Sequence, residues 1–437
     1  MRPRTVSFVR PNLGDYRSTD ALPPLAFGIL AARTPPWVKL RFFDEKVEEL
    51  PADDRPDLAA LTVETFTARR AYAIADRYRA RGVPVVLGGY HPTFLPEEAL
   101  EHAEAVVEGD AEGVWERLLE DFSMGRLQRR YKGDSARSLA DVRVDRSIFR
   151  DKYYPPIVPV QYGRGCRFSC DFCSIHAFYK TSRRQRPLER LSEELSSLNR
   201  RRLVFFVDDN LFTTPADFSA FLNHIRPFRL RWSCQISVDI AKESRLLDAM
   251  AEAGCVSALI GFESLIPENL RQMKKGWNRH FGTFGEVVRA FHRRGIAVNG
   301  AFVFGYDGET VDSIRRTVEF AVESRMEVAN FNILTPTPGS DLYGRLRREN
   351  RLLLPTWWTD PRYRFGDPVF VPRRITPERL SEECFNAKKR FYSWGSIAGR
   401  LWRSEAGLDW FRTGTMAFAN FVSRREILKK HRMALGG

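Results

Sequence analysis

Over the first 120 residues, short apolar runs alternate with longer stretches in which apolar and polar residues are mixed. The runs have the length of buried strands, and they fall at residues 5–9, 38–43, 58–63, 84–87 and 105–107. Because helix-length segments separate them, these strands should run parallel and be joined by crossovers. We therefore predict an α/β domain with a doubly wound parallel sheet over residues 1–125, followed by a polar linker over residues 126–156.

The same alternation resumes after the linker. Six further apolar runs fall at residues 158–162, 203–207, 231–237, 256–261, 296–304 and 328–334. Six βα units are too few for the eightfold barrel, so they predict a partial, TIM-like (β/α)6 barrel over residues 157–345. The active site of such a barrel lies at the C-terminal ends of its strands. Residues 346–437 are predicted to form a mostly helical C-terminal region.

Composition narrows the class of protein only slightly. The 437 residues, 43% of them hydrophobic, are enough for two or three domains. No run of about 18 apolar residues occurs and no signal-peptide block opens the sequence, so we expect a cytoplasmic protein. The 69 basic and 55 acidic residues give a formal charge of +14, which favours an acidic ligand, a nucleic acid or an anionic membrane, but which a solvated basic surface explains equally well. No RNA-binding module is evident, so no nucleic-acid partner is expected.

A cluster of cysteines carries the clearest chemical signal. Cys166, Cys170 and Cys173 form a CxxxCxxC run directly after the first barrel strand. In a reducing compartment such a cluster indicates a metal rather than disulfides. Thiolates suit both iron-sulfur clusters and zinc, and zinc would need a fourth ligand, for which His176 is the nearby candidate. The remaining cysteines are isolated, and we expect buried structural thiols at Cys234, Cys255 and Cys384.

The cysteine loop resembles the signature of the radical S-adenosylmethionine superfamily. The resemblance implies that the three cysteines hold a 4Fe-4S cluster whose open iron binds S-adenosylmethionine. It also implies cofactor contacts at later strand ends, from Phe172, Asp208, Asp209, Asn210, Gln235, Glu263, Ser264, Gly305 and Pro338. A helix cap or turn is the alternative explanation for an acid such as Asp208, and a helix N-terminal charge for Glu263. For Lys274 and Lys275 we favour a solvated helix face over contact with the cofactor.

The first domain carries glycines at two strand ends, where they let a ligand approach the backbone. This arrangement resembles the cobalamin-binding domain that precedes the barrel in one branch of the superfamily. The implied contacts are Thr62, Gly88, Gly89, His91, Glu108 and Gly109. The DxHxxG loop that supplies a lower histidine to cobalt is absent, and His91 lies on a different loop. Cobalamin therefore either binds without that histidine or has been lost.

The resemblance implies that S-adenosylmethionine is cleaved to methionine and a deoxyadenosyl radical. With cobalamin, the expected outcome is methylation of an unactivated carbon or phosphorus in a small molecule, a lipid or a tetrapyrrole-like metabolite. The alternatives are radical oxidative cyclisation, transfer of another fragment of S-adenosylmethionine, and a non-catalytic zinc-binding module. A methylthiotransferase acting on RNA is disfavoured because no cysteine precedes Cys166.

Two kinds of partner are also expected. A radical enzyme of this type needs an electron donor such as flavodoxin or ferredoxin. The C-terminal region combines many arginines with aromatic residues, namely Phe391, Tyr392, Trp394, Trp402, Trp410, Phe411, Phe418 and Phe421. Such a stripe could touch an anionic membrane or cover an apolar substrate, although packing on the neighbouring domain is the more common use.

Overall fold

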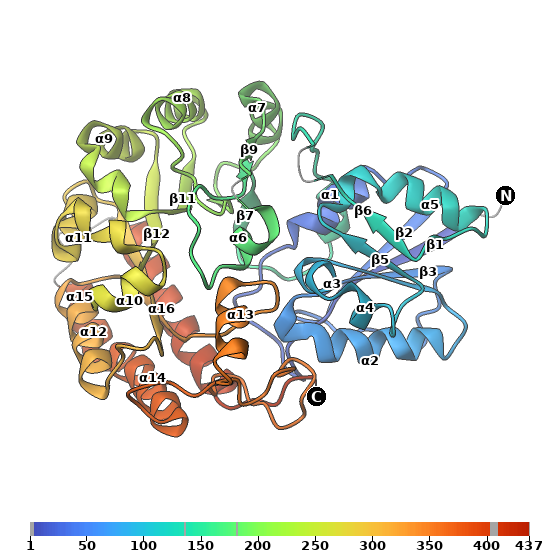
Figure 1. Cartoon of the computed structure of the whole chain (residues 1–437). Coiled ribbons are helices and arrows are strands. Elements are labelled where there is room, and N and C mark those ends of the chain that lie inside the picture. Colours follow the sequence, from blue (N-terminus) through green and yellow to red (C-terminus); the bar gives the residue numbers. More distant parts are fainter. Residues whose placement is uncertain (1–3, 135–136, 181, 403–409, 437) are drawn as a thin grey trace.

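The computed structural model describes residues 4–134, 137–180, 182–402 and 410–436. They form two parallel-sheet units joined by a linker, with helices of the C-terminal region packed against the second unit (Figure 1). The N-terminal sheet has the strand order β2-β1-β3-β4-β5-β6 with every neighbouring pair parallel. Its strands are β1 (Arg4–Arg10), β2 (Val38–Asp44), β3 (Leu58–Thr62), β4 (Val85–Gly88), β5 (Ala105–Glu108) and β6 (Arg130–Lys132). The predicted doubly wound sheet is confirmed.

Helices cover both faces of this sheet, because its central strands are apolar on both sides. They are α1 (Leu25–Ala32), α2 (Ala68–Arg79), α3 (Tyr90–Phe94), α4 (Pro96–Ala99) and α5 (Trp115–Ser123). Strand β6 comes from the segment that the sequence suggests as a polar linker. Only Tyr131 is buried in this three-residue edge strand, so its sequence carries too little apolar pattern to reveal it.

The second sheet has the order β14-β13-β12-β11-β10-β7, again with every neighbouring pair parallel. Its strands are β7 (Ile157–Val160), β10 (Leu203–Phe206), β11 (Arg231–Ile236), β12 (Cys255–Glu263), β13 (Ala297–Phe304) and β14 (Val328–Ile333). A separate two-stranded antiparallel sheet is formed by β8 (Gly163–Arg164) and β9 (Arg184–Gln185). The predicted partial barrel of six strands is confirmed.

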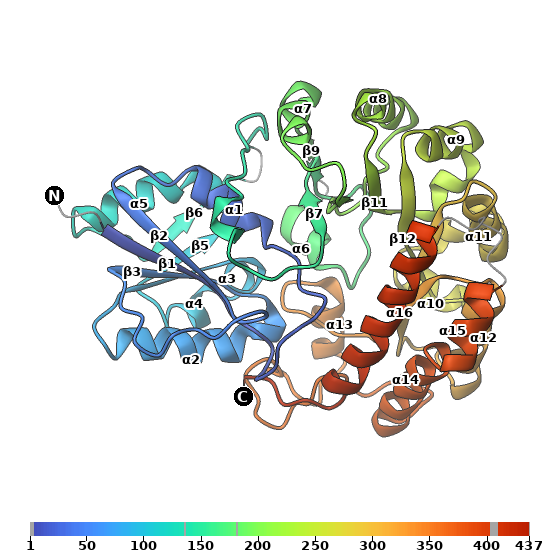
Figure 2. The ribbon, with the colours of Figure 1, turned by 180° about the vertical axis from the view of Figure 1, so that it is seen from behind.

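The barrel helices alternate with these strands. They are α6 (Ser174–Tyr179), α7 (Leu188–Ser196), α8 (Pro215–Ile225), α9 (Ser244–Glu252), α10 (Pro267–Gln272), α11 (Phe284–His292) and α12 (Val311–Glu323). The C-terminal helices are α13 (Asp341–Arg348), α14 (Pro377–Phe391), α15 (Trp394–Trp402) and α16 (Trp410–Lys430). In the view from behind, α16 crosses the barrel side of the molecule and leads to the chain end beside the N-terminal domain (Figure 2). Among the described helices, none has the length and apolar character needed to cross a membrane.

Side chains of the C-terminal region cap the free edge of β14. The Tyr392 hydroxyl donates to the Ala329 carbonyl at 3.0 Å, and Arg400 and Asn420 each donate to the Glu327 carbonyl at 2.9 Å. An open barrel leaves such edge groups unpaired, and these side chains satisfy them. Packing on the barrel is thus one use of the aromatic C-terminal stripe, since Tyr392 is buried. The side chains of Trp402, Trp410 and Phe411 lie outside the described residues.

The two units are fastened to each other at several points. The Tyr154 hydroxyl of the linker donates to Asp44 of β2 at 2.7 Å, and the Trp358 indole N–H donates to Glu98 of α4 at 2.9 Å. At the chain end, the Gly436 N–H donates to the Leu13 carbonyl at 2.8 Å. The barrel and the N-terminal sheet therefore hold a defined relative placement.

Candidate active site

The carboxyl ends of both sheets contribute to one cavity of about 360 Å3 between the two units. From the N-terminal unit it takes Thr62, Gly88, Gly89 and Gly109, which are four of the six predicted cobalamin residues. From the barrel side it takes Gln161, Arg164, Phe178, Tyr179 and Val207. Ligands of open parallel sheets bind at this edge. The cavity is lined mainly by apolar side chains and backbone, as expected for a site that holds part of a large organic cofactor.

Gly89 shows why glycine is needed in this wall. Its φ is +112°, and a Cβ atom built there would lie 2.8 Å from the Val63 carbonyl oxygen. Any other residue would push the loop away from β3 or distort it. The backbone approach that the glycine pattern predicts is therefore present in the structure.

The other two predicted cobalamin residues do not line the cavity. His91 is fully buried, with Nε2 3.1 Å from Glu98 Oε1 and Nδ1 3.4 Å from Thr65 Oγ1. Glu108 accepts two hydrogen bonds from Arg130, at 2.6 Å and 3.0 Å, and these bonds lower the pKa of Glu108. Both side chains are therefore engaged in holding the domain together.

The cysteine loop follows β8 and is held by hydrogen bonds at two points. The Gly165 N–H donates to Asp209 Oδ2 at 2.7 Å, and the Tyr306 hydroxyl donates to Asp171 Oδ1 at 2.5 Å. Gly165 has a φ of +83°, and a Cβ atom there would lie 2.0 Å from the Ser182 carbonyl oxygen. The loop therefore has one well-defined backbone path. Its three cysteines are free thiols, buried at Cys170 and half-buried at Cys166 and Cys173.

Burial dominates the electrostatics of these thiols. It raises the pKa of Cys170 to about 12 and also raises the pKa values of Cys166 and Cys173. Cys166 raises the pKa values of Cys170 and Cys173, and Cys173 raises that of Cys170, so the three thiols lie within electrostatic reach of one another. The Lys275 charge acts in the opposite direction on Cys166 and Cys170. Metal ligation requires thiolates, so loading a cluster here must release protons.

The zinc alternative lacks an assembled ligand set. Across the described residues, no group of three or more His, Cys, Asp or Glu side chains is arranged to hold one metal ion. His176 Nδ1 lies 3.1 Å from the Lys180 carbonyl oxygen of its own helix end. A four-iron cluster binds each cysteine through a different iron, so it does not need the thiols to meet at one point.

The residues after β10 and in β11 are linked by hydrogen bonds to one another and to the segment that precedes the cysteine loop. Asp208 accepts backbone N–H bonds from Tyr162, at 3.0 Å, and from Gly163, and burial raises its pKa to about 7. Asn210 Nδ2 donates to Ser237 Oγ at 3.0 Å. Gln235 Nε2 donates to the Asp209 carbonyl at 2.9 Å. These contacts fix the loops around the barrel mouth; direct contact of the same residues with the cofactor stays a prediction.

The end of β12 contains a buried ion pair. Glu263 has a φ of +65° at a register shift with β13, and only 8% of it is exposed. Lys275 Nζ donates to Glu263 Oε1 at 2.8 Å and to the Gly261 carbonyl at 3.2 Å. Burial lowers the pKa of Lys275, but the charges of Glu263 and Cys170 outweigh it and raise that pKa. Strained backbone of this kind accumulates at functional sites.

The interpretation of Lys275 as part of a solvated helix face is therefore wrong. Lys274 does lie at the surface, half exposed, and donates to Asp341 at 2.7 Å. Lys275 follows the end of α10, where helical periodicity no longer indicates the direction of a side chain. No local signal separates these neighbouring lysines.

The remaining predicted contacts also lie around the strand ends. The Ser264 hydroxyl accepts from Asn269 Nδ2 at 3.3 Å, and Phe172 packs edge-on against Tyr306 with ring centroids 6.5 Å apart. Gly305 has a φ of +118° and approaches Leu380 of α14. Pro338 is buried in a loop whose next residue, Gly339, touches the ring of Phe94 in the N-terminal unit.

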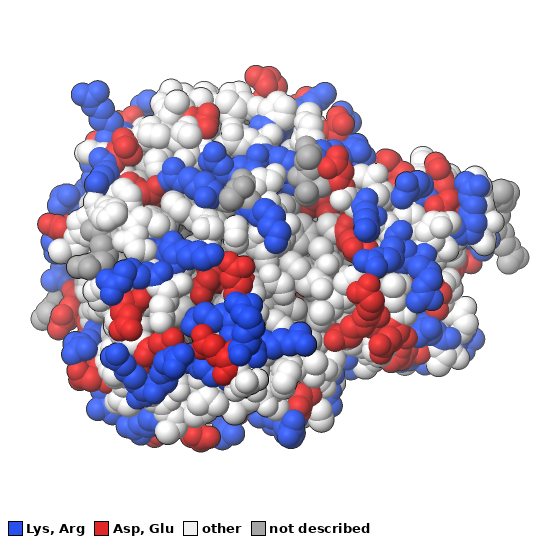
Figure 3. All heavy atoms as spheres, in the orientation of Figure 1, with Lys and Arg blue, Asp and Glu red and all other residues white. Residues whose placement is uncertain are grey.

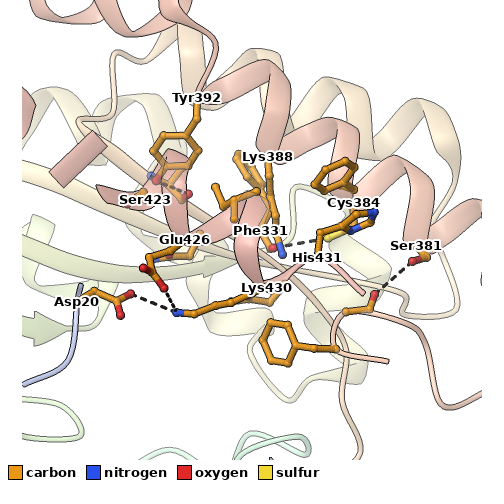
Figure 4. Close-up of a pocket in the computed structure, with 17 residues that line it drawn as sticks. Asp20, Phe331, Ser381, Cys384, Lys388, Tyr392, Ser423, Glu426, Lys430 and His431 are labelled. Carbon is orange, nitrogen blue, oxygen red and sulfur yellow. Dashed lines mark hydrogen bonds and ion pairs between the residues drawn. The ribbon is translucent and has the colours of Figure 1, made fainter. Parts of the chain in front are cut away.

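Two further regions help to define the site by contrast. A second cavity, of about 220 Å3, lies between β14, α14 and α16 and contains none of the predicted site residues (Figure 4). Its Lys430 pairs with Glu426 at 3.1 Å and with Asp20 at 3.4 Å.

On the face shown in Figure 3, Lys and Arg side chains are interleaved with Asp and Glu rather than gathered into one field. That face supports the solvated-surface interpretation of the basic charge.

Comparison with known proteins identifies both domains. The chain matches the model of the radical SAM superfamily over residues 160–321 and that of the B12 binding domain over residues 29–119. It is 29% identical to bacteriochlorophyllide d C-12(1)-methyltransferase of Chlorobaculum tepidum, over 89% of this chain and 86% of that one. It is 24% identical to anaerobic magnesium-protoporphyrin IX monomethyl ester cyclase of Cereibacter sphaeroides, over 91% of this chain and 72% of that one.

A solved structure shows the same fold. The radical S-adenosylmethionine methyltransferase TsrM from Kitasatospora setae, with cobalamin and a 4Fe-4S cluster bound, superposes with a TM-score of 0.62 at 18% identity, covering 98% of this chain and 99% of that one. A three-cysteine loop on a partial barrel, preceded by a glycine-lined cavity on a parallel sheet, defines an enzyme with two cofactor sites. The chain belongs to the radical S-adenosylmethionine superfamily, in the branch that carries an N-terminal cobalamin-binding domain.

The family's cofactors are a 4Fe-4S cluster, S-adenosylmethionine and cobalamin, and the residues present fit them. Three free thiols lie together on one fixed loop, as cluster ligation requires. The cavity beside Gly89 admits close approach to backbone, as a bound nucleotide-like group requires. Sequence reasoning missed other lining residues, including Asp110, Glu112 and Arg164, because charges after a strand usually mark a solvated turn.

Proposed function

We propose that this protein transfers a methyl group to an unactivated carbon or phosphorus of a small-molecule substrate. One observation carries the proposal: a single cavity takes Thr62 and Gly89 from the cobalamin-binding unit and Arg164 from the barrel, two residues before Cys166. This cavity supports the proposal that a site for a methyl carrier lies next to a site for radical generation. We assign the first to residues 1–125 and the second to residues 157–345, with 126–156 as the linker and 346–437 as a covering region.

The chain's own residues have distinct parts in this proposal. When bound, the cluster supplies the electron that cleaves S-adenosylmethionine, and cobalamin supplies the methyl carrier. Cys166, Cys170 and Cys173 would hold the cluster. The buried Lys275 ammonium offers a charge partner for a carboxylate, and Glu263 offers one for an ammonium. Their burial strengthens both interactions and keeps water from the reacting groups.

The relatives suggest a substrate class. Bacteriochlorophyllide d C-12(1)-methyltransferase and hopanoid C-2 methylase, the latter 27% identical over 76% of this chain, are named for a tetrapyrrole and a lipid. We propose a substrate of the same kind, apolar over most of its surface. The second candidate function is radical oxidative cyclisation, favoured by the similarity to the anaerobic cyclase. Product mass separates the two, because only methylation adds one CH2 unit.

The deciding experiment is metal analysis. The protein should be purified without oxygen from cells supplied with cobalamin, and its absorption spectrum recorded with iron, sulfide and cobalt contents. Four irons and one cobalt per chain are expected. Iron without cobalt would remove the methyl carrier from the proposal, and zinc without iron would overturn it entirely.

Two partners belong to the same proposal. Flavodoxin or ferredoxin would supply the electron. Peripheral contact with an anionic membrane would use α16, whose Phe418, Phe421 and Leu428 are exposed on one face with Arg425. Sedimentation with vesicles that contain anionic lipid, compared with neutral ones, tests this contact. We place the reaction in the cytoplasm, where such donors keep the cluster reduced.

A further inference from the structure

Residues that flank the cysteine loop also form the wall of the cobalamin cavity. The barrel side of the cavity takes side chains from both flanks, Gln161 and Arg164 before the loop and Phe178 and Tyr179 after it. Helix α6, which carries the second pair, starts at Ser174, directly after Cys173. The cysteine loop therefore cannot shift without moving part of the cavity wall.

One carboxylate of the N-terminal unit binds both flanks. Asp110 Oδ1 lies 3.2 Å from Arg164 Nη1 and accepts a hydrogen bond from the Tyr179 hydroxyl at 3.0 Å. Asp110 Oδ2 accepts from Arg184 Nη2 of β9 at 2.6 Å. Asp110 directly follows Gly109, which lies in the cavity wall and bonds Thr93 Oγ1 at 3.0 Å. The same short loop thus shapes the cavity and holds the cysteine loop.

The contact is buried and balanced in charge. Arg164 also donates to Glu112, and its side chain is 7% exposed, while the side chains of Asp110 and Glu112 are each 11% exposed. Buried ion pairs depend steeply on geometry, because a displaced partner leaves an uncompensated charge. A shift on one side of this contact is therefore transmitted to the other.

We propose that Asp110 and Arg164 couple the two cofactor sites, so that cobalamin in the cavity and the cluster on the cysteines strengthen each other's binding. Cluster ligation fixes Cys166 and with it the backbone of Arg164, which orients the Asp110 loop. Cobalamin orders the same loop from the other side. When one cofactor has already ordered this loop, the second cofactor binds with a smaller loss of conformational entropy. The coupling must be reciprocal, because it is a property of the binding equilibria. This inference rests on the proposed presence of both cofactors.

The test compares hydroxocobalamin binding to the iron-free and the cluster-loaded protein by equilibrium dialysis with cobalt analysis. In the wild-type chain we expect the loaded form to bind about fivefold or more tightly, the lower end of ordinary coupling between sites. The ratio of the two affinities should fall towards one in two variants. Asp110→Asn keeps the shape of the side chain and removes its charge, and Arg164→Lys keeps the charge and removes the planar guanidinium that can bind two carboxylates. The converse readout is the rate at which an iron chelator strips the cluster, which cobalamin should slow by a similar factor in the wild type alone.

Lys152→Gln is the matched control. It removes a different ion pair, between Lys152 of the linker and Glu48 of the N-terminal unit, and neither residue lines the cavity. It should keep the wild-type ratio. Equal affinities in the two forms of the wild type, or a ratio unchanged in both Asp110→Asn and Arg164→Lys, would overturn the coupling. A wild type that binds no cobalamin or no iron would instead overturn the proposed function, so the two failures are distinguishable.

Discussion

The two cofactor sites are lined mainly by different kinds of chemical groups. Apart from the ion pairs of Arg164 with Asp110 and Glu112 on its barrel side, the cavity of the N-terminal unit is shaped by backbone and apolar side chains, and no room is left for a Cβ atom at Gly89. The barrel mouth is instead made of ionisable side chains that are buried together, as in the pair of Lys275 and Glu263. The first site should therefore be sensitive to added volume, and the second to removed charge or lost ligands. Substitutions at each site can test that division.

The largest effect is expected from Cys170→Ala. Removing one of three thiolate ligands should abolish the cluster, so the iron content should fall from four per chain to near zero. Cobalamin should still bind, with the affinity of the iron-free protein. Cys384→Ala is the control: this thiol is also buried, but it contacts the Phe331 carbonyl at 3.5 Å, away from the loop. Iron retained in Cys170→Ala, or lost in Cys384→Ala, would contradict the assignment.

The next effect is expected from Lys275→Met. It leaves Glu263 buried without its cation, which typically costs about 3–5 kcal/mol. Urea unfolding followed by circular dichroism should show this loss, and binding of S-adenosylmethionine should weaken with it. Lys274→Met, at the exposed neighbour, should cost less than about 1 kcal/mol.

A double variant sharpens the same prediction. In Lys275→Met with Glu263→Gln, the unpaired charge is gone, so stability should recover in part relative to Lys275→Met alone. Equal costs at the two lysines, or a double variant less stable than either single one, would show that the pair is not the buried interaction described above.

A third, smaller effect should appear in the other site. Gly89→Ala places a methyl group 2.8 Å from the Val63 carbonyl oxygen and should lower the affinity for cobalamin by about tenfold or more, while the iron content stays unchanged. Gly82→Ala is the control that separates backbone strain at a positive φ from a steric clash of the added methyl group. Gly82 also has a positive φ, +74°, but nothing lies within 4 Å of its would-be Cβ. It should keep the wild-type affinity, and a similar loss in both variants would mean that backbone strain alone is responsible.

The same contrast explains what the sequence could reveal. The strands and their parallel order follow from local apolar runs, and the cysteine loop from a short motif after the first barrel strand. The glycines were informative because a φ such as that of Gly89 restricts the residue type. His91 and Glu108 belong to the predicted loops, but a loop pattern does not tell which side chains face the cavity.

What could not be predicted depends on partners that are distant along the chain. Lys275 is turned inward by Glu263, on another element, and Arg164 is buried by carboxylates of the N-terminal unit. In sequence, both resemble ordinary surface charges. The edge strand β6 was hidden for a related reason, because its three residues are stabilised by pairing with β5 rather than by an apolar pattern of their own.

The last predicted effect concerns the protonation of buried carboxyl groups. In the barrel, burial raises the pKa of Glu309 to about 7, so the folded state keeps a proton that the unfolded chain, with a value of 4.5, releases. Between these two values the unfolded state binds fewer protons, so stability should fall as pH rises, by at most about 1.4 kcal/mol per pH unit for this group. In the N-terminal unit the sign is opposite: burial raises the pKa of Glu98, but hydrogen bonds from His91 and Tyr72 outweigh it and lower that pKa.

Glu309→Gln tests this difference without changing the shape of the side chain. The variant should lose part of the decline in stability between pH 4.5 and 7, measured as urea midpoints across that window. Glu382→Gln, at an exposed carboxylate of α14, should keep the wild-type slope. A steeper decline in Glu309→Gln would mean that this carboxyl is ionised in the folded barrel. Buried acids of the barrel would then behave as Glu98 does, and the electrostatic contrast between the two sites would not hold.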